Sequence, residues 1–166
     1  MALSVKKVAL WRRELSNRPG ALAAVLEPLS RAGADLQIAM GYRFPGDESR
    51  AAIEIAPVTS RKATAAAQGA GMQPSGIPTL MVVGDNRPGL GFAFSQGMAD
   101  AGINMAFLVA QVIAGRYSAV LGFESDADAD RAAAIIKKAS SVKKKASGAR
   151  KTSRARKTSK KRRTRR

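Results

Sequence analysis

The chain has 166 residues and a formal net charge of +17, and it contains neither cysteine nor histidine. Disulfides, thiolate nucleophiles, imidazole bases, the common zinc sites and Ser-His-Asp catalysis are therefore excluded, and we expect neither a metal nor a cofactor. Sixteen of the 29 Lys and Arg residues lie between Lys137 and Arg166, a stretch without Asp or Glu, which leaves 13 basic and 12 acidic residues elsewhere. This division predicts a nearly neutral folded part followed by a basic tail.

The chain begins with the sequence MALSVKKVALWRREL, which lacks the apolar stretch of a signal peptide. No segment approaches the run of about 18 apolar residues that a membrane-spanning helix needs. We therefore expect a soluble, cytoplasmic protein that does not contact a membrane.

The first expected element is a strand-like run through Val8, Leu10 and Trp11, which stops at the sequence Asn-Arg-Pro-Gly of residues 17–20. Pro19 suits the first turn of a helix, because its missing N–H would be unpaired there. Apolar residues then recur at the spacing of one helical face. They are Leu22, Val25, Leu26 and Leu29.

Pro28 lies inside this predicted helix, where a proline costs about 3 kcal/mol. We therefore expect a kink near Ala24 or an early end of the helix. Gly33 is a suitable residue for its C-terminal stop.

Two strands and a weak helix are expected next. Residues 36–42 alternate apolar and small or polar side chains, as a strand with one buried face does. A turn at 44–49 precedes a returning strand at 51–55. Residues 59–70 form a poor helix, because alanines line its face and two basic residues at its start oppose the helix dipole.

The second half of the chain repeats this order. Asn-Arg-Pro-Gly recurs at residues 86–89, 69 positions after its first occurrence, and the same offset places Ala101-Gly102 on Ala32-Gly33. A buried strand at 80–83 precedes the loop, and a helix that opens at Pro88 follows it. Self-similarity at a fixed spacing indicates two copies of one structural unit.

The last elements are two strands and a helix. Residues 105–110 are apolar on both faces, and 117–123 form the returning strand. Ser125 and Asp128 form a capping box at the start of the final helix, and Lys137 and Lys138 lie at its positive end.

Each unit therefore reads β-α-β-β-α, which predicts an α+β fold of two antiparallel sheets with helices on one face. We place the units at residues 1–77 and 78–139, and a disordered Lys/Arg-rich tail at 140–166. Neither unit has a good candidate for a fourth strand, because 72–78 holds two prolines and 140–146 is mostly charged.

A strand, the sequence Asp-Asn-Arg-Pro-Gly, an amphipathic helix, Ala-Gly-Ile-Asn-Met and a two-stranded return together resemble the ACT domain. ACT domains are ferredoxin-like βαββαβ modules that bind amino acids in regulatory proteins. The resemblance covers about residues 7–57 and 79–138. It implies a non-catalytic regulatory protein of two ACT-type repeats.

The resemblance also implies a ligand site at the loop before the first helix and near the start of the second strand, where two units meet. The implied ligand-binding residues are Asn17, Arg18, Pro19, Gly20, Asp35, Asp85, Asn86, Arg87, Pro88, Gly89, Asn104 and Met105. Glycine lets a ligand approach the backbone, and a helix start offers free N–H groups to a carboxylate. Asp85 or an Asn side chain could hold an ammonium group. Alternatively, Asn-Arg-Pro-Gly is only a well-formed helix start that folding alone requires.

A homodimer is also expected. ACT-type units commonly pair edge to edge, and the second apolar face of Ala106, Leu108, Ala110 and Val112 needs a cover. Missing fourth strands would leave further unpaired edges, which natural proteins tend to protect.

The tail has Val142 as its one sizeable apolar residue and resembles in composition the tails of linker histones and bacterial histone-like proteins. Its cations should bind DNA or another polyanion without sequence preference. These residues are Lys143, Lys144, Lys145, Arg150, Lys151, Arg154, Arg156, Lys157, Lys160, Lys161, Arg162, Arg163, Arg165 and Arg166. Two alternatives stay open: a tail that only keeps the protein soluble, and a nucleoid-associated protein whose repeats serve only for dimerisation.

Three other patterns are too weak to carry a function. The sequence RPGLGFAF has Phe94 where a dinucleotide fingerprint needs its third glycine. Residues 115–123 resemble a strand of an RNA-recognition domain, but Ala119 holds the position of the stacking aromatic residue. Asp126, Asp128 and Asp130 lack the glycine and glutamate of a calcium loop, and helix capping accounts for them.

Overall fold

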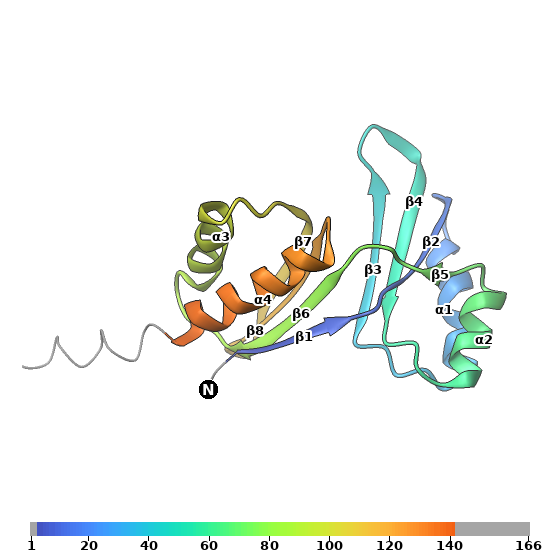
Figure 1. The fold of residues 1–166 in the computed structure, drawn as a ribbon. Helices are drawn as coiled ribbons and strands as arrows, with labels where there is room; N and C mark the ends of the chain where they lie inside the picture. Colours follow the sequence, from blue (N-terminus) through green and yellow to red (C-terminus); the bar gives the residue numbers. More distant parts are fainter. Residues whose placement is uncertain (1–2, 142–166) are drawn as a thin grey trace, which may run out of the picture.

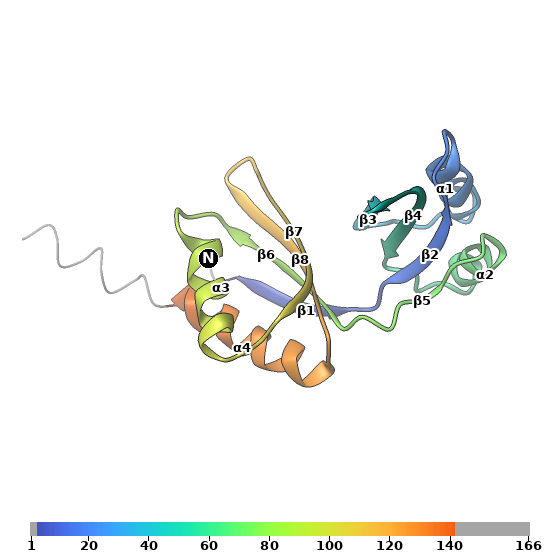
Figure 2. The same ribbon diagram turned by 90° about the horizontal axis from the view of Figure 1, so that it is seen from above.

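The computed structural model describes residues 3–141, which form two four-stranded antiparallel sheets, each with two helices on one face (Figures 1 and 2). The elements follow in the order β1 Ser4–Val8, β2 Trp11–Ser16, α1 Ala21–Arg31, β3 Ile38–Phe44, β4 Asp47–Ala56, α2 Arg61–Gly69, β5 Gln73–Pro74, β6 Thr79–Asp85, α3 Leu90–Asp100, β7 Met105–Ile113, β8 Arg116–Phe123 and α4 Asp126–Ser141. We call the sheet of β2, β3, β4 and β5 with α1 and α2 the first unit. The second unit is the sheet of β1, β6, β7 and β8 with α3 and α4.

The two sheets have the same topology. The strand order is β3-β4-β2-β5 in the first unit and β7-β8-β6-β1 in the second. In each, the strand before the loop lies beside the returning strand, as in a ferredoxin-like fold. The predicted α+β class with two such repeats is confirmed.

Both units have a fourth strand, although the sequence offered no good candidate for either. β5 supplies a two-residue fourth strand in the first unit, where it pairs with Trp11 and Arg12. In the second unit β1 takes that place and pairs with β6 over five positions, from Ser4 opposite Val83 to Val8 opposite Thr79.

The strand-like run expected through Val8 and Trp11 is therefore two strands in different sheets. The chain starts in the second unit, leaves it after Val8 to form the first unit, and returns beside its own beginning (Figure 1). The Lys7 ammonium lies 2.8 Å from Asp130 of α4, and this hydrogen bond is the main cause that raises the pKa of Lys7. Sequence periodicity indicates a strand but not its partner, which here lies more than seventy positions away.

The repeated loop is a tight turn placed just before each helix. Arg18 O accepts from Ala21 N, and Arg87 O accepts from Leu90 N, both at 3.2 Å. The glycines of the two turns have φ of 83° and 78° with ψ near zero, the third-residue geometry of a type II turn. The prolines thus precede the helices, which corrects the expectation that they lie in the first turn.

The helix ends agree in part with expectation. Gly33 has φ 71° and ends α1, with its N–H bonded to Ser30 O and the next N–H bonded to Leu29 O, a Schellman motif. The predicted Ser125–Asp128 contact at the start of α4 is present, because Ser125 Oγ accepts from Asp128 N at 3.1 Å and donates to Asp128 Oδ2 at 2.8 Å. The early end predicted for α1 is wrong, since the helix continues through Pro28 to Arg31.

Each unit has its own apolar core, and a third cluster joins them. The second unit buries large side chains such as Phe94 and Phe123, whereas alanines form part of the first core. Leu10, Ile38 and Val120 belong to the joining cluster. Among residues 3–141, no helix is long and apolar enough to cross a membrane.

Candidate functional site

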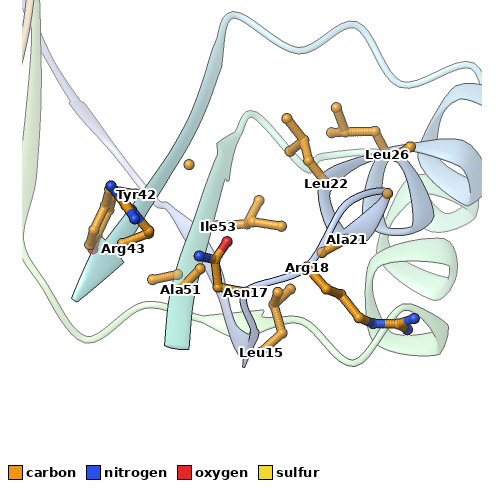
Figure 3. Close-up of a pocket in the computed structure, with 14 residues that line it drawn as sticks. Leu15, Asn17, Arg18, Ala21, Leu22, Leu26, Tyr42, Arg43, Ala51 and Ile53 are labelled. Carbon is orange, nitrogen blue, oxygen red and sulfur yellow. The ribbon is translucent and has the colours of Figure 1, made fainter. Parts of the chain in front are cut away.

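A cavity of about 850 Å³ lies in the first unit between α1 and the strands β3 and β4 (Figure 3). Three residues of the predicted loop line it, namely Asn17, Arg18 and Gly20. The tight turn brings them there, because it directs the chain from the end of β2 into the start of α1. The first predicted loop therefore borders a space large enough for a small molecule.

Asn17 fixes the mouth of this cavity. Its backbone N–H donates to Ser49 O at 2.7 Å, and its Nδ2 donates to Glu48 O at 2.9 Å. Both bonds hold the β3–β4 hairpin against the loop. In the described part of the chain, the Oδ1 atom of Asn17 has no hydrogen-bond partner, so it can accept a bond from a ligand.

The start of α1 also faces the cavity, and two of its N–H groups have no hydrogen-bond partner among residues 3–141. Ala21 N bonds to Arg18 O, and Ala24 N bonds to Gly20 O. The N–H groups of Leu22 and Ala23 lie between them, and α1 has neither a capping side chain nor an acidic residue in its first turn. Such a helix start carries partial positive charge and binds anions.

Apolar side chains form the wall of the cavity. Leu22 and Leu26 extend from α1 toward the strands, and Ile53 points toward them from β4 (Figure 3). Leu22 remains 46% exposed, which is high for a leucine on the inner side of a helix. The cavity thus offers an apolar wall beside a polar mouth, as small-molecule sites usually do.

No family model and no curated protein matches the sequence. Solved structures do match. Protein BT0572 from Bacteroides thetaiotaomicron superposes with a TM-score of 0.65 at 14% identity, over 81% of this chain and 89% of that one. The ligand-free regulatory subunit of aspartate kinase from Thermus thermophilus gives 0.56 at 16% identity, over 84% and 97%. The Thermus flavus subunit gives 0.54 at 17% identity, over the same shares.

At these identities the likeness shows the fold alone. The fold is that of tandem ACT-like repeats. The two units described above are therefore ACT-like units, and the expected resemblance is confirmed at the level of architecture.

The loop of the second ACT-like unit has the same turn in different surroundings. Asp85 pairs with Arg116 at 3.2 Å, and Asn86 N donates to Gly115 O at 2.9 Å. Arg87 donates to Ala139 O at the end of α4. Arg87 and Gly89 line a separate cavity of about 440 Å³ between α3 and α4.

Of the remaining predicted ligand residues, all but Pro88 line neither of these two cavities. Asp35 is exposed before β3, and Met105 packs against the second core. Asn104 donates to Glu124 Oε1 at 3.3 Å. Pro19 lies in the turn without lining the larger cavity, whereas Pro88 lines the smaller one. Their role in ligand binding remains a prediction.

Sequence reasoning missed the part of the larger cavity that β3 and β4 contribute. Gly41, Arg43 and Ile53 line it, and none of them lies near the loop in sequence. The alternation of these strands indicates which side chains share a face, but no pattern in the sequence shows that α1 leaves that face uncovered. Only the packed unit reveals this gap.

A polar cluster occupies the opposite face of the same sheet. Glu54 is fully buried, and its Oε1 accepts from Arg12 at 3.0 Å and from the Tyr42 hydroxyl at 3.2 Å. Burial, followed by the charge of Glu54, raises the pKa of Tyr42. Arg12 also bonds to Glu14, and this bond is the main cause that lowers the pKa of Glu14. The cluster holds three strands together. Its Tyr42 also lines the larger cavity, whereas Arg43, Ala51 and Ile53 of the cavity lining belong to the opposite face of the sheet.

Proposed function

We propose that this protein is a non-catalytic regulatory protein that binds an amino acid in the larger cavity of the first unit. The observation that carries the proposal is the meeting of the repeated loop, an uncapped helix start and an apolar wall at one cavity of about 850 Å³. The regulatory subunits of similar fold support the regulatory role without identifying a ligand.

The cavity offers a partner for each group of an amino acid. The α-carboxylate can accept from the N–H groups of Leu22 and Ala23 at the start of α1. The ammonium group can donate to Asn17 Oδ1. An apolar portion of the side chain can pack against Leu26 and Ile53.

Titration calorimetry of the full chain against the twenty amino acids tests the proposal. We expect one saturable site per chain. Gly20→Val should abolish binding, because it forces a β-branched residue into a positive φ beside the proposed carboxylate position. Gly89→Val is the matched control, since it places the same strain in the same turn of the second unit. Loss of binding with Gly89→Val alone, or no binding at all by folded protein, would contradict the site.

The second part of the proposal concerns the tail, whose cations lie outside the described residues. We propose that they bind DNA through release of counterions. If about eight phosphates are engaged, the log–log dependence of affinity on salt should have a slope near −7. A chain that ends at Ser141, where α4 ends, should lose this binding. Equal DNA binding by the full chain and the shortened chain would show that the tail does not bind DNA and only keeps the protein soluble.

The third part is a homodimer formed through β7. This strand lies at the edge of its sheet and exposes four large apolar side chains, Leu108, Val109, Val112 and Ile113. Such an edge can pair with a second copy. Light scattering should give twice the mass of 17.5 kDa. Val109→Lys should return the mass to that of a monomer.

The alternative is a nucleoid-associated protein in which the repeats serve only for dimerisation. The exposed edge of β7 favours it over a free monomer, and the cavity would then stay without a ligand. Binding of DNA by a dimer that takes none of the twenty amino acids would establish this alternative. A DNA-bound tail would in either case place the protein on the nucleoid within the cytoplasm.

A further inference from the structure

The arginine of the repeated loop has a structural role in only one of its two copies. In the second unit Arg87 is half-buried and donates to Ala139 O, one of the last carbonyls of α4, which that helix cannot pair internally. In the first unit Arg18 is exposed, and within residues 3–141 it makes neither a side-chain hydrogen bond nor an ion pair. The first residue of a type II turn need not be arginine. The fold therefore accounts for Arg87 but not for Arg18.

The charged side chains that line the larger cavity are all basic. Two arginines, Arg18 and Arg43, line it together with the start of α1. None of its fourteen lining residues is an aspartate or a glutamate. Arg43 does contact Glu48 at 3.4 Å, but both side chains are exposed, so a ligand can replace this pair at small cost.

The two arginines lie at different sides of the cavity. Arg43 of β3 is opposite Ala51 of β4, which is opposite Leu15 at the end of β2. Two strand spacings therefore separate Arg43 from Leu15, about 10 Å. Arg18 follows Leu15 by three residues, and its guanidinium extends away from the strands (Figure 3). Because the side chain is exposed, rotation would be needed, and is sterically open, for it to meet a ligand in the cavity. A second anionic group of a ligand can thus pair with the Arg43 guanidinium at one side of the cavity or with the Arg18 guanidinium at the other.

From this charge pattern, and resting on the proposed function, we infer that the larger cavity binds an acidic amino acid. The α-carboxylate accepts from the first N–H groups of α1, and the side-chain carboxylate pairs with Arg43 or Arg18. A basic amino acid would place its second cation beside these arginines, where no Asp or Glu lines the cavity and Glu48 already pairs with Arg43, and like charges in proximity are unfavourable. A neutral amino acid would leave both guanidinium groups without a ligand partner.

Calorimetry on the full chain can separate this inference from the proposed function. The probes are aspartate and glutamate, their amide isosteres asparagine and glutamine, and lysine. The acids should bind at least about tenfold more tightly than their isosteres, which corresponds to one charge-assisted contact. Because the basic tail attracts any anion weakly, only saturable binding at one site per chain counts.

Three variants complete the test. Arg43→Gln and Arg18→Gln should together remove the preference for acids over amides while binding of the amides persists. Arg31→Gln is the matched control, because Arg31 is an exposed arginine of the same unit that lies at the far end of α1 and pairs with Glu27. It should change nothing.

The possible failures differ. If none of the twenty amino acids binds, the proposed function fails, and this inference fails with it. If a neutral or basic amino acid binds as tightly as the acids, or if the double variant keeps the preference, the proposed function stands and the acidic ligand is overturned.

Discussion

The two copies of Asn-Arg-Pro-Gly have almost the same backbone but face different surroundings. Gly20 and Gly89 have φ of 83° and 78°, and each turn leads into a helix of eleven residues. In the first unit the turn borders an open cavity, whereas in the second its arginine is bonded to the end of α4. A short sequence can thus determine a turn completely and leave its role to whatever packs against it.

The largest effect should follow removal of residues 1–8, which tests whether these residues belong to the unit they pair with or to the unit they precede. The deletion removes β1 with its five pairs to β6 and the apolar side chains of Leu3 and Val5 from the second core. We expect a loss of about 3–5 kcal/mol in the second unit. Hydrogen exchange should accelerate in β6 and β8 and stay slow in β2 and β4. Faster exchange confined to the first unit would contradict the observed pairing.

Gly122→Ala comes next and examines a difference in packing density between a strand of the second unit and a strand of the first. A Cβ at Gly122 would overlap the Phe107 ring and lie 2.9 Å from Ile77 Cγ2. The expected cost is about 1–3 kcal/mol in the free energy of urea unfolding, because packed interiors absorb extra volume poorly. Gly41→Ala in the first unit is the control, since a Cβ there meets nothing within 4 Å. Equal effects of the two changes would disprove the close packing.

Gly20→Ala and Gly89→Ala test the equality of the two turns. Each places a side chain at positive φ, which should cost about 1–2 kcal/mol in either unit. Gly91→Ala, inside α3 and with open space around it, should instead stabilise by up to about 1 kcal/mol. Thermal unfolding followed by circular dichroism measures all three. No loss of thermal stability with Gly20→Ala would show that residue 20 need not keep its positive φ in the first turn.

The smallest expected effect is on the loss of stability at acidic pH. The bond from Arg12 lowers the pKa of Glu14 below its ordinary value of 4.5. A lowered pKa in the folded state contributes stability that is present above pH 4.5 and is lost as the pH falls through the folded value. Glu14→Gln should therefore flatten the acid dependence of stability of the first unit. The fluorescence of Trp11, which packs in that unit and is the one tryptophan of the chain, reports it. An unchanged dependence would show that the ion pair is lost in solution.

Local hydrophobic periodicity, together with the residues that begin and end helices and form turns, was sufficient to predict most elements of the fold. The repeat, the two turns, the contact of Ser125 with Asp128 and the stop at Gly33 depend on neighbours within a few residues, so the sequence determined them. The helix through Pro28 was one exception. Pro28 disfavours a helix at this position, but Val25 and Leu29 on either side of its turn are buried in the first core, and this packing favours the helix.

Tertiary structure alone decided which sheet each strand joins and which loop borders a cavity. β1 reads as a strand in sequence, but its partner β6 lies far along the chain, and hydrogen-bond pairing between distant segments leaves no local pattern. The same holds for the candidate site, since Asn17 and Gly20 were predicted from their loop while Arg43 and Ile53 reached it only through pairing of β3 with β4. Local backbone preferences are therefore set by the sequence, and the space between elements is set by how the folded units pack.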